Sequence, residues 1–240
     1  MGRRLLIPAV VTLIAVGGVL SLGVWQIERR AWKQDLIATR AAALAAPPVT
    51  ITKAVTASPV PIADLTPASA TGFFRHDLEM ILLGRAGKDT PGVHIATPLV
   101  LADGAILMVD RGWVSNTRRD PGARLQGQID GVVTVTGLLR QPQQPGAFTP
   151  PSQPADRQFF FADLPSMAQS AGLGPALPYL LEAGPAPNPG GWPQGGQTKL
   201  ELSNNHLQYS LTWFTLAIAG LVIFGLWARR TLSAPNEVKP

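Results

Sequence analysis

The chain has 240 residues, of which 46% are hydrophobic and 15% are charged, and its formal net charge is +5. Ordinary soluble domains carry about a quarter charged residues, so this composition indicates a contribution from membrane-spanning segments. No cysteine is present, which excludes disulfides, zinc–thiolate sites and thiol nucleophiles, and no long basic tract points to a nucleic-acid partner.

The first apolar run predicts a membrane-spanning helix at residues 8–27. A helix of this length measures about 30 Å and crosses a hydrocarbon core. Pro8 is tolerated at its start because the first amide of a helix has no intrahelical partner. The alternative is a cleaved signal peptide with Arg3 and Arg4 as its basic region, but the apolar run is longer than signal peptides usually have.

A second uncharged apolar run predicts another span at residues 209–228. Arg3 and Arg4 precede the first span, and Arg229 and Arg230 follow the second. Basic residues favour the cytoplasmic side, so both termini are predicted to be cytoplasmic. The remaining segments are then residues 1–7 and 229–240 in the cytoplasm, and residues 28–208 on the exported side.

The exported segment is predicted to begin with a helical extension at residues 28–46, which lacks Gly and Pro as far as Pro47-Pro48. A short helix is expected from a cap at Asp163 to about Ser170. Short apolar runs predict strands at residues 49–56, 73–83, 93–101, 105–109, 132–139, 159–161 and 179–182. The predicted fold class is therefore α+β, with two transmembrane helices flanking a mainly-β domain whose antiparallel sheet is curled or forms a partial barrel.

His206 is the histidine with the strongest case for a functional role. Asn204 and Asn205 are natural N-cap residues, which places His206 in the first turn of the second span. His206, Tyr209 and Trp213 share one helix face, and a helix N-terminus favours the neutral imidazole that can bind a metal. The alternative interpretation is an interfacial polar residue among aromatic side chains that anchor the helix.

The end of the first span carries matching features. Trp25, Arg29 and Trp32 share a helix face, and Gln26 lies beside them. If both helices cross the same interface, this face and the His206 face can lie side by side. Aromatic walls, a neutral histidine and guanidinium groups suit a planar tetrapyrrole with propionates. A belt that anchors the helices in the membrane is the alternative.

Small residues in the spans predict how the two helices pack. Gly17 and Ser21 form a small-residue face on the first helix, which is expected to approach Ala217 or Gly220 on the second.

Within the exported segment, Asp110-Arg111-Gly112-Trp113 ends an apolar strand and predicts either a structural corner or a partner-binding loop. His76 and His94 are interpreted as core or edge side chains. No catalytic motif is present, so an enzyme is not expected, although a hydrolase built from scattered Asp and Ser residues stays a remote alternative.

Three segments together resemble one known family. They are Leu22-Gly23-Val24-Trp25-Gln26 with Arg29, Trp32, Lys33 and Leu36; Gly92-Val93-His94 with Val109-Asp110-Arg111-Gly112-Trp113-Val114; and Asn204-Asn205-His206-Leu207-Gln208-Tyr209 with Leu211, Thr212, Trp213 and Phe214. Their order and their placement relative to the spans are similar to those of the surfeit locus protein 1 family of cytochrome c oxidase assembly factors. The chain departs from the family where an arginine-rich stretch is often found, at residues 68–72, and at Ser115, where the family has proline.

The resemblance implies a non-enzymatic role in maturing the haem–copper subunit of the oxidase. Some bacterial members are thought to bind haem a through a histidine at the second span. That histidine corresponds to His206, and the haem iron is the one metal that His206 is expected to bind. Binding is expected to be transient. The other candidate haem contacts are Trp25, Arg29, Tyr209 and Trp213. The candidate partner contacts are Gln26, Trp32, Asp110, Arg111, Gly112, Trp113, Asn204, Asn205 and Gln208.

The expected partners are the catalytic subunit of the oxidase, the enzyme that synthesises haem a, and membrane lipid. The expected location is the bacterial inner membrane, with the main domain in the periplasm. A haem-independent scaffold that stabilises an oxidase subunit intermediate is the alternative function, and a membrane-anchored hydrolase is a distant third.

Overall fold

The computed structural model describes the chain apart from residues 1, 85–90, 201–202 and 234–240. The chain divides into a helical unit, made of residues 1–41 and 201–240, and a domain made of residues 42–200. The helical unit thus joins two segments from opposite ends of the sequence.

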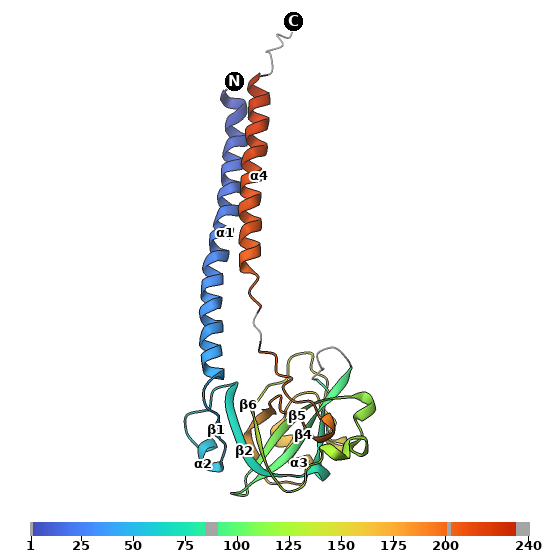
Figure 1. The fold of residues 1–240 in the computed structure, drawn as a ribbon. Helices are drawn as coiled ribbons and strands as arrows, with labels where there is room; N and C mark the ends of the chain where they lie inside the picture. The colour runs from blue at the N-terminus through green and yellow to red at the C-terminus, as the bar shows by residue number, and fades with distance from the viewer. Residues whose placement is uncertain (1, 85–90, 201–202, 234–240) are drawn as a thin grey trace. The chain divides into compact units, whose positions relative to one another are not determined.

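The helical unit consists of α1 (Gly2–Leu44) and α4 (His206–Ser233), which lie side by side (Figure 1). Both helices are long and apolar enough to cross a membrane, and few residues of their apolar stretches are buried. The spans predicted at residues 8–27 and 209–228 lie inside them. Beyond its apolar part, α1 continues until just before Pro47-Pro48, because no helix-breaking residue intervenes.

One line of buried and half-buried side chains joins α1 to α4. It includes Val16, Gly23 and Gln26 on α1, and Ser210 and Ala217 on α4. The positions recur every three or four residues, which is the spacing of a seam between two long, closely packed helices. The two helices therefore meet along one continuous seam.

Gly23 is the glycine that lets the helices approach closely, since a Cβ atom there would lie 2.7 Å from the ring of Phe214. The prediction that Gly17 and Ser21 form this face is wrong. A Cβ atom at Gly17 would meet nothing within 4 Å, and Ser21 is exposed. At about 100° per residue, Gly17 projects about 120° and Ser21 about 160° away from Gly23. On α4 the predicted residue Ala217 does lie in the seam, where it is 2% exposed.

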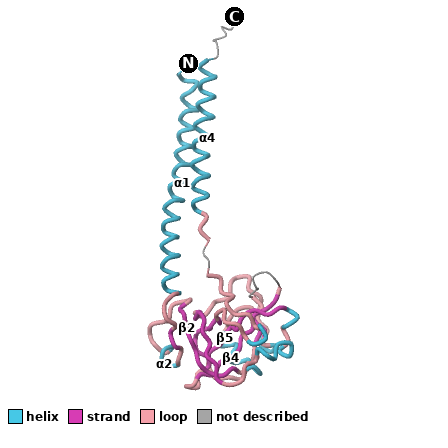
Figure 2. Tube along the Cα trace, viewed as in Figure 1, coloured by secondary structure: helices cyan, strands magenta, loops and turns pink. Residues whose placement is uncertain are grey.

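The described residues of the domain form eight strands and two short α-helices; Figure 2 shows where helices, strands and loops lie along the chain. In chain order these are β1 (Val49–Thr50), α2 (Lys53–Thr56), β2 (Thr66–Phe74), β3 (Met80–Leu82), β4 (Gly92–Leu101), β5 (Ile106–Ser115), β6 (Val132–Arg140), β7 (Gln158–Phe159), α3 (Leu164–Ser170) and β8 (Ala176–Ala183). Short 3-10 turns lie at His76–Leu78, Asn116–Arg118, Pro121–Gly127, Pro154–Asp156 and Pro189–Gly191. The short helix predicted after Asp163 is confirmed as α3, whose first turn is capped by the Asp163 carboxylate.

The strands form one sheet in the order β1-β2-β6-β8-β5-β4-β3-β7, and β2 also pairs with β4. This extra pairing joins Gly72–Phe74 to Leu99–Leu101 and closes a ring of five strands, β2-β6-β8-β5-β4. The β1–β2, β3–β7 and β5–β8 pairs are parallel and the others are antiparallel. The predicted class is therefore confirmed: two helices and a mostly antiparallel sheet, here curled into a small barrel.

Two predicted strands are wrong. Of residues 49–56 only Val49–Thr50 forms a strand, because a new helix, α2, begins after its cap at Thr52. At residues 73–83 the chain turns in the middle of the predicted strand. β2 ends at Phe74, and β3 begins only after the 3-10 turn His76–Leu78. The Arg75 side chain closes this turn by donating two hydrogen bonds to the Asp77 carboxylate. The first part of β2 was missed because its residues are small and give little apolar signal.

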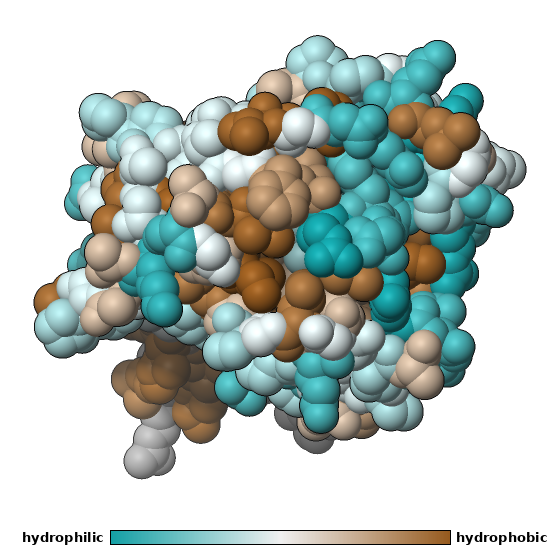
Figure 3. Space-filling model, turned by 90° about the horizontal axis from the view of Figure 1, so that it is seen from below, coloured by the Kyte–Doolittle hydropathy of each residue, from teal (hydrophilic) through white to brown (hydrophobic). Residues whose placement is uncertain are grey.

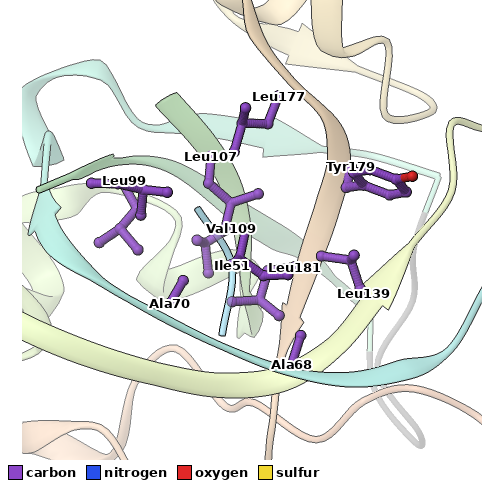
Figure 4. Close-up of a cluster of buried hydrophobic side chains, with 11 residues drawn as sticks. Ile51, Ala68, Ala70, Leu99, Leu107, Val109, Leu139, Leu177, Tyr179 and Leu181 are labelled. Carbon is purple, nitrogen blue, oxygen red and sulfur yellow. The ribbon is translucent and has the colours of Figure 1, made fainter. Parts of the chain in front are cut away.

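The main core fills the space enclosed by the ring of strands (Figure 4). Its side chains come from β2, β4, β5, β6 and β8, and include Leu99, Leu107, Val109, Leu139 and Leu181. A second cluster packs α3 against β3, β4, β5 and β8 through Met167 and its neighbours. Burial of these side chains on both faces of β4 and β5 fixes the frame on which the polar residues of those strands are held.

The surface is not uniformly polar. Figure 3 shows apolar and hydrophilic side chains intermingled on one face of the molecule, with apolar ones gathered near its centre. In the domain, Phe73 on β2 and Val132 on β6 are partners in the sheet register, and they are 46% and 74% exposed. The domain therefore offers apolar side chains for contact with another molecule.

Candidate functional site

The first candidate site is a contact between the two long helices. The Nδ1 atom of His206, the first residue of α4, lies 2.7 Å from the amide Oε1 of Gln26 on α1. Because an amide oxygen only accepts hydrogen bonds, Nδ1 carries the proton and donates. In a neutral imidazole the other nitrogen, Nε2, then keeps its lone pair. The contact therefore leaves Nε2 as the ring nitrogen that carries the lone pair.

Two further hydrogen bonds join the helices near this contact, one on each side along the helix pair. The Ser210 hydroxyl donates to the Gly23 carbonyl at 3.2 Å, and the Asn204 amide donates to the Arg30 carbonyl at 3.4 Å. Asn204 was predicted as a capping residue, but this hydrogen bond takes its side chain across to α1. The His206 ring is thus attached to a rigid part of the helix pair.

The aromatic candidates on α4 lie close to the seam. Trp213 is half-buried on the same face as His206, and Tyr209 is 55% exposed at its flank. Asn205 and Gln208, two predicted partner contacts, are exposed. The start of α4 thus presents His206 beside two large aromatic side chains.

The aromatic candidates on α1 point elsewhere. Trp25 and Trp32 are 52% and 49% exposed, and the Arg29 guanidinium lies 3.7 Å from the centre of the Trp32 ring. At about 100° per residue, this stripe projects roughly 130° away from the line through Gly23 and Gln26 that faces α4. The structure therefore does not bring the Trp25 stripe and the His206 face side by side, as the sequence predicted; Gln26 is the residue that meets His206.

The described part of the chain contains no group of three or more His, Cys, Asp or Glu side chains arranged to hold a metal ion. A metal that takes all its ligands from such side chains does not fit there. His206 would supply one nitrogen ligand to a porphyrin iron, whose remaining nitrogen ligands come from the macrocycle itself.

The second candidate site is the polar interior of the domain, around the Asp110-Arg111-Gly112-Trp113 motif on β5. The His94 Nδ1 lies 2.9 Å from the Asp110 carboxylate, which also accepts a hydrogen bond from the Gly112 amide. His94 and Asp110 are 4% and 3% exposed, and among the described residues the His94 Nε2 has no hydrogen-bond partner. Asp110 is therefore an internal anchor of the sheet.

Arg111 is the largest fully buried side chain of the domain. Its guanidinium donates to the Gly127 carbonyl and the Asn188 side chain, and lies 4.8 Å from the centre of the Phe74 ring. Burial and the nearby charge of Arg124 lower the pKa of Arg111 to about 10, so it stays a cation at neutral pH. Backbone and side-chain oxygens around it compensate part of the lost hydration.

Gly112 and Trp113 contact the segment that follows β8, at Trp192 and Gln194. The backbone of Trp113 exchanges two hydrogen bonds with that of Gln194, at 2.8 and 2.9 Å, and its ring packs on Trp192. Gly112 has a φ of +111°, and a Cβ atom there would collide with the Gln194 carbonyl. The absence of a side chain at Gly112 thus lets this segment approach β5 closely and pair with it at Trp113.

A polar cavity of about 480 Å³ opens beside these residues. It is lined by His94 and Asp110, by the Arg140–Glu182 ion pair, and by Thr198 and Lys199 at the end of the domain. Sequence reasoning missed the His94–Asp110 pair because 16 residues separate them; the β4–β5 hairpin register, which brings Ala96 opposite Asp110, was the available signal. It also missed the buried Arg124–Glu79 ion pair, for which the sequence carries no local signal.

Comparison with known proteins gives one consistent family. Residues 13–218 match the SURF1 family. The chain is 33% identical to a SURF1-like protein of Monosiga brevicollis over 87% of this chain and 83% of that protein. It is 31% identical to surfeit locus protein 1 of Mus musculus, over 95% and 75% of the two chains, and 32% identical to that of Homo sapiens, over 82% and 70%.

Proposed function

The chain belongs to the SURF1 family, a family of cytochrome c oxidase assembly factors, and from that premise we propose that it handles haem a during maturation of the oxidase's catalytic subunit. In this proposal haem a is cargo, the redox group that the catalytic subunit requires, and the chain binds it transiently at the start of α4. It holds and transfers the group without catalysing a reaction.

One observation carries the proposal: His206 has its Nδ1 tied to Gln26 while its Nε2 is left as an acceptor. This is the arrangement of a histidine ligand, which donates its second ring N–H to an oxygen and binds metal through the other nitrogen. Tyr209 and Trp213 would contact the macrocycle, because aromatic rings stack on a flat conjugated group. The Trp25–Arg29–Trp32 stripe, which faces away, would contact lipid headgroups at the membrane interface.

The proposed location is the bacterial inner membrane, with both termini in the cytoplasm and residues 28–208 in the periplasm. The basic residues flanking the two apolar helices support this orientation. Reporter fusions at Ala102 and after Pro240 test it. Ala102 should report from outside and Pro240 from inside, and an exported C-terminus would contradict the topology.

The proposed partners are the catalytic subunit that receives the haem, the enzyme that supplies it, and the surrounding lipid. A second candidate function, a scaffold that stabilises an oxidase subunit without touching haem, is favoured by a different observation. The exposed pair Phe73 and Val132 offers an apolar contact on the domain that haem binding does not use.

The absorbance spectrum of the full chain, purified in detergent from cells that make haem a, separates the two functions. The haem proposal predicts a haem a spectrum that co-purifies with the chain. A preparation that supports full oxidase assembly and contains no haem at any stoichiometry would overturn the haem proposal and leave the scaffold.

A further inference from the structure

We propose that Gln26 is the positioning residue of the haem site: it fixes the tautomer of His206 and so determines which ring nitrogen is offered to the iron. This inference rests on the proposed function, which it deepens. The contact joins residues 180 positions apart in the sequence, at a distance of 2.7 Å between Gln26 Oε1 and His206 Nδ1. Gln26 itself does not touch the iron.

The two ring nitrogens of a neutral imidazole play different roles. The ring carries one N–H and one lone pair, and the proton resides where an acceptor binds it. The Gln26 oxygen lies at Nδ1, so the proton is held there and the lone pair is held at Nε2. Without that oxygen, either nitrogen of His206 can carry the proton, and only one of the two forms is ready to bind metal at Nε2.

The position of Gln26 in the helix seam makes the constraint rigid. Gln26 and His206 are both half-buried, and interhelical hydrogen bonds flank them at Ser210–Gly23 and Asn204–Arg30. Because Gly23 has no side chain, α4 lies close enough for an amide on α1 to reach the ring. The seam therefore fixes the orientation of the ring as well as its tautomer.

The competing explanation is that Gln26–His206 is only one more hydrogen bond between the helices. Ser210 provides the matched control, because Ser210→Ala removes an interhelical hydrogen bond one turn away and leaves Gln26 and His206 intact. A purely structural role predicts that Gln26→Leu and Ser210→Ala behave alike. A positioning role predicts that they differ in the protonation pattern of the ring.

The test is the ¹⁵N spectrum of the histidine rings in the full chain, labelled, haem-free and solubilised in detergent. The chain has three histidines, so His206→Ala identifies the signal of His206 by subtraction. We expect the Nδ1–H form in the unmodified chain and in Ser210→Ala, and loss of that preference in Gln26→Leu. Gln26→Glu keeps an oxygen acceptor and should restore it.

Haem titration of the same proteins supplies the second readout. Gln26→Leu should weaken haem binding roughly tenfold or more, as the loss of orienting partners of metal ligands usually does, and Ser210→Ala should not. The inference is overturned if Gln26→Leu leaves the Nδ1–H form unchanged, or if Ser210→Ala has the same effect as Gln26→Leu. If the tautomer responds as expected but His206→Ala binds haem with an unaltered spectrum, it is the proposed function that fails.

Discussion

The helix pair and the domain use polar residues in opposite ways. In the domain, Asp110 and Arg111 are almost completely buried and their side chains are bound by neighbouring strands and loops. In the helix pair, His206 is half-buried, and the hydrogen bond found for its ring among the described residues is the one from Nδ1 to Gln26. A polar side chain whose hydrogen bonds are all made within the protein supports the fold. A side chain that has an unused donor or acceptor atom at a surface is available to a ligand.

Asp110 and Arg111 are therefore expected to contribute to the stability of the domain, and the haem binding that we propose belongs to the helix pair. Both regions carry residues by which the chain resembles its family, so resemblance alone does not distinguish the two roles. The location and the hydrogen bonds of each side chain do. Substitutions in the domain motif should therefore act through folding, and those at the start of α4 through haem.

The largest expected effect is that of Gly112→Ala. The new Cβ must adopt a φ of +111° and collides with the Gln194 carbonyl, so the segment that crosses β5 is displaced. We expect a loss of roughly 3 kcal/mol in the free energy of unfolding of the domain. Hydrogen–deuterium exchange of the β4 and β5 amides in the full chain measures it.

Gly104→Ala is the matched control for this change. Gly104 also has a positive φ, +76°, but a Cβ atom there would meet nothing within 4 Å. Its cost should be that of backbone strain alone, about 1 kcal/mol. Equal effects of the two substitutions would show that the crossing segment does not depend on Gly112.

A smaller effect is expected for Gly23→Leu in the helix pair. The added side chain would separate α1 from α4 at Phe214, at a cost of about 1 kcal/mol in helix association. Gly17→Leu faces open space and should have no effect. Because the chain has no cysteine, the disulfide yield of a Val16→Cys/Gly220→Cys pair reports helix pairing directly. Reduced crosslinking in Gly17→Leu would contradict the observed seam.

The smallest effect concerns pH. Burial, and secondarily the charge of Arg111, lower the pKa of His76, whose Nδ1 faces the Arg111 guanidinium. In the unfolded chain the histidine takes up a proton near pH 6.5, whereas the folded domain resists it. The stability of the domain is therefore complete above about pH 6.5 and decreases as the pH falls below it.

Amide exchange of the full chain at pH 7.5 and 5.5, corrected for the intrinsic pH dependence, measures this change. His76→Gln removes the titrating group, so its stability should depend less on pH over this interval than that of the unmodified chain. An identical pH dependence of the two proteins would contradict the lowered pKa.

The sequence predicts the two long helices well, because an uninterrupted apolar run has few alternatives to a span. It also predicts β4, β6 and α3, which have strong apolar patterns or a clear cap. It fails where side-chain contacts, and not an apolar pattern, decide the structure. The turn after Phe74 depends on Arg75 and Asp77, and the strand before it is made of small residues.

The candidate site was only partly predictable for the same reason. His206 could be singled out from its position at the start of a span, but its partner depends on the rotation of one helix against the other. The spacing of residues shows which side chains share a face within each helix. It does not show that Gln26 meets His206 or that Trp25 faces away from α4. Small residues occur on both sides of α1. Gly17 and Gly23 are therefore equally good candidates for the helix contact when only the sequence is considered.

The most direct test of the account is the haem spectrum and occupancy of His206→Ala and His206→Gln in the full chain. The account predicts weakened haem binding and an altered spectrum in both variants, because neither an alanine nor an amide replaces an imidazole as an iron ligand. Protein level, topology and helix crosslinking should be unchanged, since the ring is only half-buried in the first turn of α4. If His206→Gln instead retains the spectrum and oxidase activity of the unmodified chain, His206 is only a hydrogen-bonding residue of the helix seam and the central claim is contradicted.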